Sequence, residues 1–139
     1  MKRAIIISLI VLFCVTIFIF SIFGSEFREM LAARVTTTTP TETYYGLAIP
    51  ASAIQTNPDT GTSYVFIAER TDKYPEKGYV AKYVECIYSE VTDEIASEID
   101  KISKSDVLID WFSAITSKSI VIVDSDKKLI DGHMVIINK

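Results

Sequence analysis

A long β-strand is predicted for the ten residues YVAKYVECIY, Tyr79 to Tyr88, which follow a turn-rich stretch at 73–78. Alternate residues of a strand point to opposite faces. One of these faces carries Val80, Lys82, Val84, Cys86 and Tyr88. Because only Lys82 interrupts its apolar character, we expect this face to be buried and the Cys86 thiol to pack inward.

Further short strands are predicted on both sides of this run, at 45–49, 63–69, 120–123 and 134–137. The residues Asn57-Pro58-Asp59-Thr60-Gly61 are dense in turn formers, so the first two of these strands are expected to form a hairpin. The stretch 107–112 fits either a strand or a helix.

One amphipathic helix is predicted over Asp93–Ser103. Thr92 can cap its first turn. Ile95, Ile99 and Ile102 follow at helical spacing. The prediction is therefore a mainly β, small barrel-like domain with one short helix, spanning 44–139 and folding without the preceding residues. Its expected core residues are Val65, Ile67, Val80, Val84, Val121, Val123, Val135 and Ile137.

The N-terminal region predicts a membrane anchor. Ala4 to Phe23 is a run of 20 residues without charge, and as a helix it would span about 30 Å, the hydrocarbon thickness of a bilayer. A freely soluble cytosolic protein and a polytopic carrier are both disfavoured. Lys2 and Arg3 precede the run, which predicts a cytoplasmic N-terminus and an extracytoplasmic C-terminal domain. The alternative is a cleaved signal peptide, whose apolar core is usually shorter.

Residues 24–43 are interpreted as a juxtamembrane tether between the anchor at 1–23 and the domain at 44–139. Its first part, 25–34, is expected to continue the anchor helix for a few turns. The run Val35-Thr36-Thr37-Thr38-Thr39-Pro40-Thr41 disfavours helix and is interpreted as an extended linker.

Charge and cysteine content exclude several protein classes. Beyond Phe23 the chain has a net charge of −6, from 12 basic and 18 acidic residues, which argues against a nucleic-acid partner. Cys14 lies inside the apolar run and Cys86 far outside it, so a disulfide framework is not expected.

No catalytic, metal or cofactor site is predicted. His133 is the single histidine and stands beside a turn glycine, which does not build a catalytic relay. Cys86 would need a neighbouring base and partial exposure to act as a nucleophile, and its apolar strand neighbours favour a buried, inert thiol. The sequence at 124–128 begins like a calcium loop, but Lys128 occupies a ligand position.

Tyrosines gather in the strand-rich half, and Tyr is common both in strands and at protein interfaces. Among the seven, Tyr64, Tyr79 and Tyr83 are the candidates for partner contact.

The order of short segments resembles the C-terminal, membrane-proximal β domain of periplasmic adaptor (HlyD-type membrane fusion) proteins. The resemblance rests on IPASAI at 49–54, YVFI at 64–67, GYVAKYVE at 78–85 and SDKKLIDG at 125–132. It implies partnership with an efflux or secretion pump and no catalytic residues. The family places lipoyl-like, α-hairpin and β-barrel parts between anchor and β domain, whereas here only about twenty residues intervene. The stretch 92–112 and His133 also depart from the family pattern.

Three functional hypotheses follow. The first is an anchored accessory subunit of an efflux or secretion transporter that contacts the bilayer and a permease subunit, with self-association left open. The second is an extracytoplasmic structural or ligand-sensing module unrelated to transport. The third, an anchored hydrolase, requires a catalytic relay that the sequence does not display.

Overall fold

The computed structural model describes residues 2–72, 78–99, 102–111 and 113–138. The chain divides into two compact units, Met1–Ala32 and Ala33–Lys139, which are described separately.

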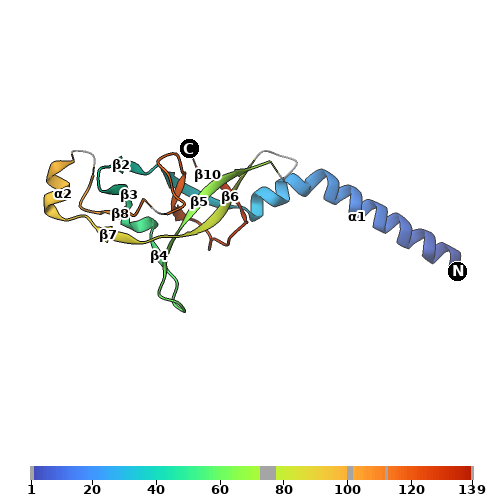
Figure 1. Cartoon of the computed structure of the whole chain (residues 1–139). Coiled ribbons are helices and arrows are strands. Elements are labelled where there is room, and N and C mark those ends of the chain that lie inside the picture. The colour runs from blue at the N-terminus through green and yellow to red at the C-terminus, as the bar shows by residue number, and fades with distance from the viewer. Residues whose placement is uncertain (1, 73–77, 100–101, 112, 139) are drawn as a thin grey trace. The chain divides into compact units, whose positions relative to one another are not determined.

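The first unit is the helix α1 (Lys2–Leu31) (Figure 1). Its segment Ile5–Gly24 is long and apolar enough to cross a membrane, and no other helix in the described part of the chain is. The helix continues beyond the apolar run to Leu31, as expected from residues 25–34.

The second unit contains a closed five-stranded β-barrel (Figure 1). Its strands are β1 (Ala33–Thr38), β5 (Ser63–Thr71), β6 (Gly78–Glu85), β9 (Val121–Ser125) and β10 (Met134–Ile137). They are bonded in the order β5-β6-β10-β1-β9, and the barrel closes where Ile67 of β5 pairs with Val121 of β9. All pairings are antiparallel except that of β1 with β10. The predicted fold class, mainly β with an N-terminal helix, is confirmed.

Every barrel strand contributes an apolar side chain to one cluster. The cluster is centred on Val35, Phe66, Ala81, Ile122 and Val135, all buried. Because the five residues come from five different strands, the barrel is filled by side chains and has a packed interior.

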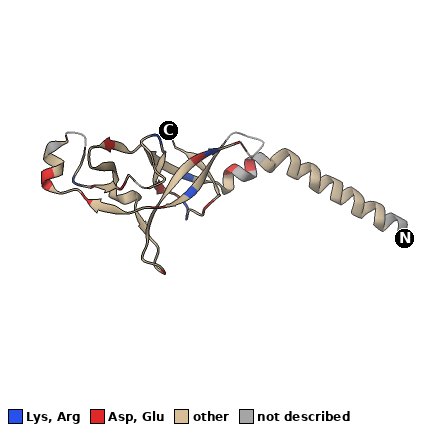
Figure 2. Ribbon diagram, in the orientation of Figure 1, with Lys and Arg blue, Asp and Glu red and all other residues tan. Residues whose placement is uncertain are grey.

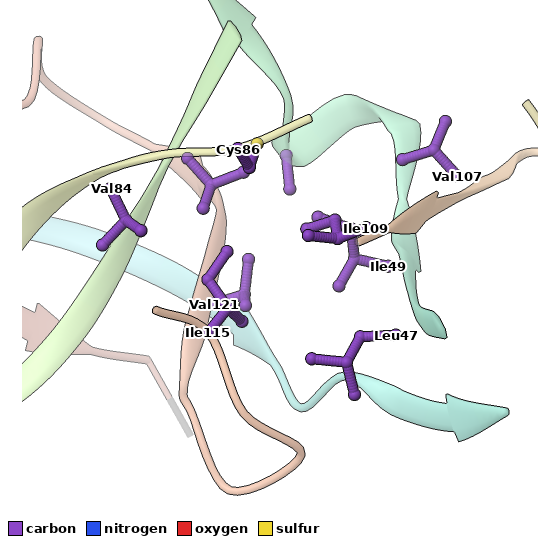
Figure 3. Packing of buried hydrophobic residues seen from close by; sticks show 10 residues of the cluster. Leu47, Ile49, Val84, Cys86, Val107, Ile109, Ile115 and Val121 are labelled. Carbon is purple, nitrogen blue, oxygen red and sulfur yellow. The ribbon is translucent and has the colours of Figure 1, made fainter. Parts of the chain in front are cut away.

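A second sheet packs against the barrel. Its strands are β2 (Thr41–Thr43), β3 (Gly46–Pro50), β8 (Asp106–Ile109) and β7 (Tyr88–Glu90), in that spatial order. One face of this sheet joins Leu47, Ile49 and Ile109 to Val84 and Val121 of the barrel (Figure 3). Cys86 belongs to the same cluster, so its predicted inward orientation is confirmed.

The other face of the second sheet packs against the short helix α2 (Asp93–Glu98) and the residues that follow it. Thr92 caps α2 by accepting a hydrogen bond from the Ile95 amide, as predicted. The helix ends at Glu98, earlier than the predicted Ser103, because Ile99 takes an extended conformation. Ile102 then reaches the apolar cluster from outside the helix.

The predicted tether is wrong over 33–38 and 41–43, because these residues form the barrel strand β1 and the strand β2 of the second sheet. Val35 is completely buried, and β1 is bonded to β9 on one side and β10 on the other. The β-branched run therefore belongs to the domain, which begins at Ala33 and not at Tyr44.

The predicted hairpin has the right turn but the wrong partner. Across the turn at 57–61, β5 pairs with the two-residue strand β4 (Gln55–Thr56), while β3 belongs to the second sheet. Pro50 and the 3₁₀-helix η1 (Ala51–Ala53) separate β3 from β4 and redirect the chain.

Three smaller predictions are resolved. The long strand ends at Glu85, and Tyr88 lies in the separate strand β7. The ambiguous stretch at 107–112 is a strand as far as Ile109. Of the predicted core, four members are buried, namely Val65, Val84, Val121 and Val135. The other four are half-buried: Ile67, Val80, Val123 and Ile137.

Candidate functional site

A polar cleft of about 290 Å³ forms where two distant segments of the sequence meet. Ser52 and Gln55 come from η1 and the start of β4, and Asp124 to Leu129 come from the end of β9 and the turn after it. Tyr64 of β5 completes the lining. The lining residues are Ser52, Gln55, Tyr64, Ile122, Val123, Asp124, Ser125, Lys127, Lys128 and Leu129. The cleft thus joins parts of the IPASAI and SDKKLIDG segments, on which the family resemblance rests.

Tyr64 is held firmly at this cleft. Its hydroxyl donates to the Gln55 side-chain oxygen at 3.0 Å. Its ring lies 4.6 Å from the ring of Tyr83, with a tilt of 31°, and meets Phe66 edge-on at 5.7 Å. Aromatic pairs in such geometries add about 0.5–1.5 kcal/mol beyond the area they bury. The Tyr64 hydroxyl is therefore presented in a fixed position.

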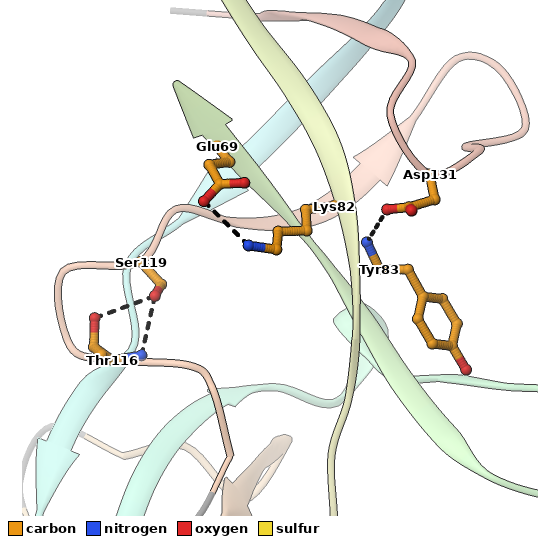
Figure 4. A network of polar contacts seen from close by, with 6 residues as sticks. All are labelled: Glu69, Lys82, Tyr83, Thr116, Ser119 and Asp131. Atoms are coloured by element: carbon orange, nitrogen blue, oxygen red, sulfur yellow. Dashed lines mark hydrogen bonds and ion pairs between the residues drawn. The ribbon is translucent and has the colours of Figure 1, made fainter. Parts of the chain in front are cut away.

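Two carboxylates fasten the turn that forms one wall of the cleft. Asp131 accepts a hydrogen bond from the Tyr83 amide at 2.8 Å, which joins the turn to β6 (Figure 4). Asp126 accepts one from the Arg34 amide at 2.7 Å, which joins it to β1. Gly132 has φ +80°, a conformation that suits glycine at the end of this turn. These acidic residues therefore position the turn.

The cleft is locally cationic on an acidic domain. Lys127 and Lys128 line it together with the single carboxylate of Asp124. Figure 2 shows how Lys and Arg are interspersed with Asp and Glu on the barrel. One of its exposed ion pairs joins Lys82 to Glu69 at 3.1 Å (Figure 4), and exposed pairs of this kind stabilise a fold by at most about 1 kcal/mol.

The three tyrosines predicted to contact a partner all lie on strands β5 and β6 of the barrel, and the rings of two of them are in contact. Tyr64 and Tyr83 stack beside the cleft. Tyr79 lies on the same face of β6 as Tyr83, where it pairs with Val135. All three are half-buried and pack against the barrel cluster. Much of each ring thus supports the fold, and their contact with a partner stays a prediction.

The two residues considered for catalysis are not brought into a relay. His133 is exposed, and its amide donates to the Ile130 carbonyl at 3.1 Å in the turn before β10. Cys86 is buried, and burial raises the pKa of its thiol. A raised pKa lowers the thiolate fraction at neutral pH, which makes Cys86 a poor nucleophile.

A second cleft, of about 330 Å³, was not foreseen from the sequence. It lies between the η1–β4 segment and strands β7 and β8. Ile54, Val107 and Tyr88 supply apolar lining, and Glu90 and Lys104 supply charge. Lys104 is paired with Asp93 at 2.6 Å. The only local sequence feature near this cleft is the group of turn-forming residues at 50–61. Such residues indicate a change of chain direction, but they do not indicate that β7 and β8 form the other wall of the cleft.

Sequence reasoning also missed the exposed aromatic residues of the second sheet. Tyr44 is 91% exposed and Trp111 is 48% exposed. The local signal at Tyr44 is the turn-forming residue Gly46 shortly after it, whereas Trp111 has no such signal.

Comparisons with known proteins do not assign the chain to a family. No protein-family model, curated protein or solved structure matches it. Within the residues that the structure describes, no group of three or more His, Cys, Asp or Glu side chains is arranged to hold a metal ion.

Proposed function

We propose that this protein is a single-pass, membrane-anchored accessory subunit of an efflux or secretion transporter. In this proposal α1 is the anchor, the N-terminus with Lys2 and Arg3 is cytoplasmic, and the β domain lies outside the membrane. The domain would act without the lipoyl-like and hairpin parts of adaptor proteins.

The observation that carries the proposal is the convergence of the resemblance-bearing segments. The IPASAI and SDKKLIDG segments are separated by 70 residues, yet Ser52 of the first lines the cleft beside Tyr64 together with four residues of the second, namely Ser125, Lys127, Lys128 and Leu129. A cleft lined by residues from distant parts of the chain offers a partner several contacts at once. The meeting of the two segments supports the cleft as the contact with a permease subunit, with Tyr64 and Lys128 as contact residues.

The experiment is crosslinking in intact cells, followed by purification of the full chain and identification of bound subunits. We expect recovery of a transporter subunit. Lys128→Glu should reduce that recovery because it reverses a charge of the cleft, whereas Lys118→Glu, an exposed lysine outside the cleft lining, should not. Recovery of no transporter subunit would contradict the proposal.

The second cleft favours an alternative, a ligand-sensing module. Its volume of about 330 Å³ lies at the lower end of the range of small-molecule sites, and apolar lining from Ile54 and Val107 accompanies a few polar groups. This alternative predicts that the purified protein binds a small molecule and that deletion leaves transport unchanged. Loss of transport on deletion would count against it.

A further inference from the structure

Three chain segments meet at one end of the second sheet, where β8 ends and β7 begins. The Ile109 carbonyl oxygen lies 2.5 Å from where a Cβ on Gly46 would stand, directly after the β2–β3 turn. The Asp110 amide donates to the Ile87 carbonyl at 3.1 Å. Since neighbouring strands are about 4.8 Å apart, Gly46 and Ile87 lie about 10 Å from each other across this end.

Large exposed apolar side chains are concentrated at these segments. In the described part of residues 33–138, six such side chains are exposed, and five belong here. They are Tyr44 (91% exposed), Tyr45 (45%), Ile87 (77%), Tyr88 (42%) and Trp111 (48%). We call these five residues the aromatic patch. The sixth, Ile130, lies in the turn before β10. Single exposed apolar residues are ordinary, but a gathering of this kind marks an interaction site.

The composition of the aromatic patch fits a protein interface. The rings of Tyr44 and Tyr45 meet edge-on at 5.5 Å. Trp111 is the only tryptophan of the chain. Trp and Tyr are the residue types that most often dominate binding energy at protein interfaces, because they bury a large area with few rotatable bonds.

The charge around the aromatic patch indicates which kind of partner can bind there. The segments 40–47, 85–89 and 108–111 contain no Lys or Arg, and their charged residues are Glu42, Glu85 and Asp110. A second copy of this chain would bring like charges together, and an anionic bilayer surface would also be repelled. A protein surface with Lys and Arg around an apolar centre is complementary.

We propose that the aromatic patch docks a partner protein whose contact surface is apolar at its centre and basic at its rim. This contact is separate from the cleft at Tyr64 and does not depend on the transporter assignment, because it rests on burial and charge alone.

The test uses three variants of the full chain, each with a photo-crosslinking amino acid in place of one residue: Tyr44, Ile87 or Ile130. Each variant is crosslinked in intact cells. Tyr44 and Ile87 are the most exposed residues of the aromatic patch, so their replacement leaves the core intact. Adducts are identified by mass spectrometry of the crosslinked peptides. We expect positions 44 and 87 to crosslink a protein through a segment rich in Lys and Arg, and position 130 not to reach that segment.

A charge reversal provides the second readout. Glu42→Lys should lower the adduct yield at position 87 about tenfold, because it places a positive charge beside the β2–β3 turn, where it would repel a basic partner. Asp59→Lys makes the same charge change at an exposed position elsewhere and should leave the yield unchanged.

Four outcomes would overturn the proposal. They are adducts with lipid, adducts with a second copy of this chain, adducts with segments that lack basic residues, and no adduct from positions 44 and 87. A yield that is insensitive to the Glu42 reversal would overturn it as well.

Discussion

Replacing Gly46 by alanine should be the most damaging of the glycine substitutions at the turns of this domain. Gly46 has φ +146°, a backbone conformation that L side chains rarely adopt. An added Cβ would lie 2.5 Å from the Ile109 carbonyl oxygen and 3.5 Å from its carbon. Both obstacles belong to the backbone of the central strand β8, which cannot rotate away as a flexible side chain can.

The magnitude follows from two separate costs. A non-glycine residue in a sparsely populated backbone region costs about 1–3 kcal/mol. Overpacking that forces a backbone shift costs about another 1–3 kcal/mol. The free energy of unfolding should therefore fall by about 2–6 kcal/mol, which for a domain of this size lowers the midpoint of thermal unfolding by at least about 10 °C.

Gly61→Ala is the matched control. Gly61 also has a positive φ, +70°, but nothing lies within 4 Å of an added Cβ. Its cost should be the backbone cost alone, about 1–2 kcal/mol.

The assay is thermal unfolding of the full chain in detergent micelles, monitored by the fluorescence of Trp111, the only tryptophan. Trp111 comes two residues after Ile109, so its indole fluorescence reports unfolding at the end of β8 that contacts Gly46. Equal midpoints for Gly46→Ala and Gly61→Ala, or a loss below about 1 kcal/mol at Gly46, would refute the argument from close backbone contact.

Three further predictions concern the domain. Residues 33–139 should fold alone while residues 44–139 should not, because the shorter fragment lacks barrel strand β1; circular dichroism of both fragments tests this, and two equally folded fragments would contradict it. Val84→Asp should unfold the domain, since it places a charge at a buried position, whereas Lys127→Asp in an exposed turn should be tolerated in urea unfolding. Alkylation of Cys86, measured by mass spectrometry against pH, should be slower in the folded protein than in the denatured chain, because burial raises the pKa of the thiol. The same raised pKa makes the folded state lose stability as pH rises through the thiol pKa of the unfolded chain, and rapid alkylation at neutral pH without denaturant would argue against burial.

Local patterns are sufficient to predict six of the individual elements, namely β3, β5, β6, β9, β10 and the start of α2. The alternation from Tyr79 onward predicted β6 and the burial of Cys86, and Thr92 marked the start of α2. These features depend on neighbours in the sequence, namely strand alternation and a capping side chain. For the same reason the turn at 57–61 was correctly placed.

Pairings between distant segments were not predictable in this way. A run of threonines suits both an exposed linker and a strand, and only the pairing of β1 with residues near 121–137 distinguishes the two. The partner of β5 was misassigned because Pro50 and η1 divert the chain into a second sheet. The cleft at Tyr64 likewise depends on the meeting of η1 with the turn after β9.

The position of β1 between β9 and β10 has a consequence for how the protein is made. β1 is among the first parts of the domain to be synthesised, yet both of its partners follow residue 120. At synthesis rates of about 5–20 residues per second, β1 waits roughly 5–20 s with both edges unpaired. An apolar strand exposed for that time would be a template for aggregation, whereas threonine side chains keep an unpaired strand hydrated. The threonine run makes β1 resemble a linker in sequence. The same run suits a strand that must stay soluble until β9 and β10, the last two strands of the barrel, have been synthesised.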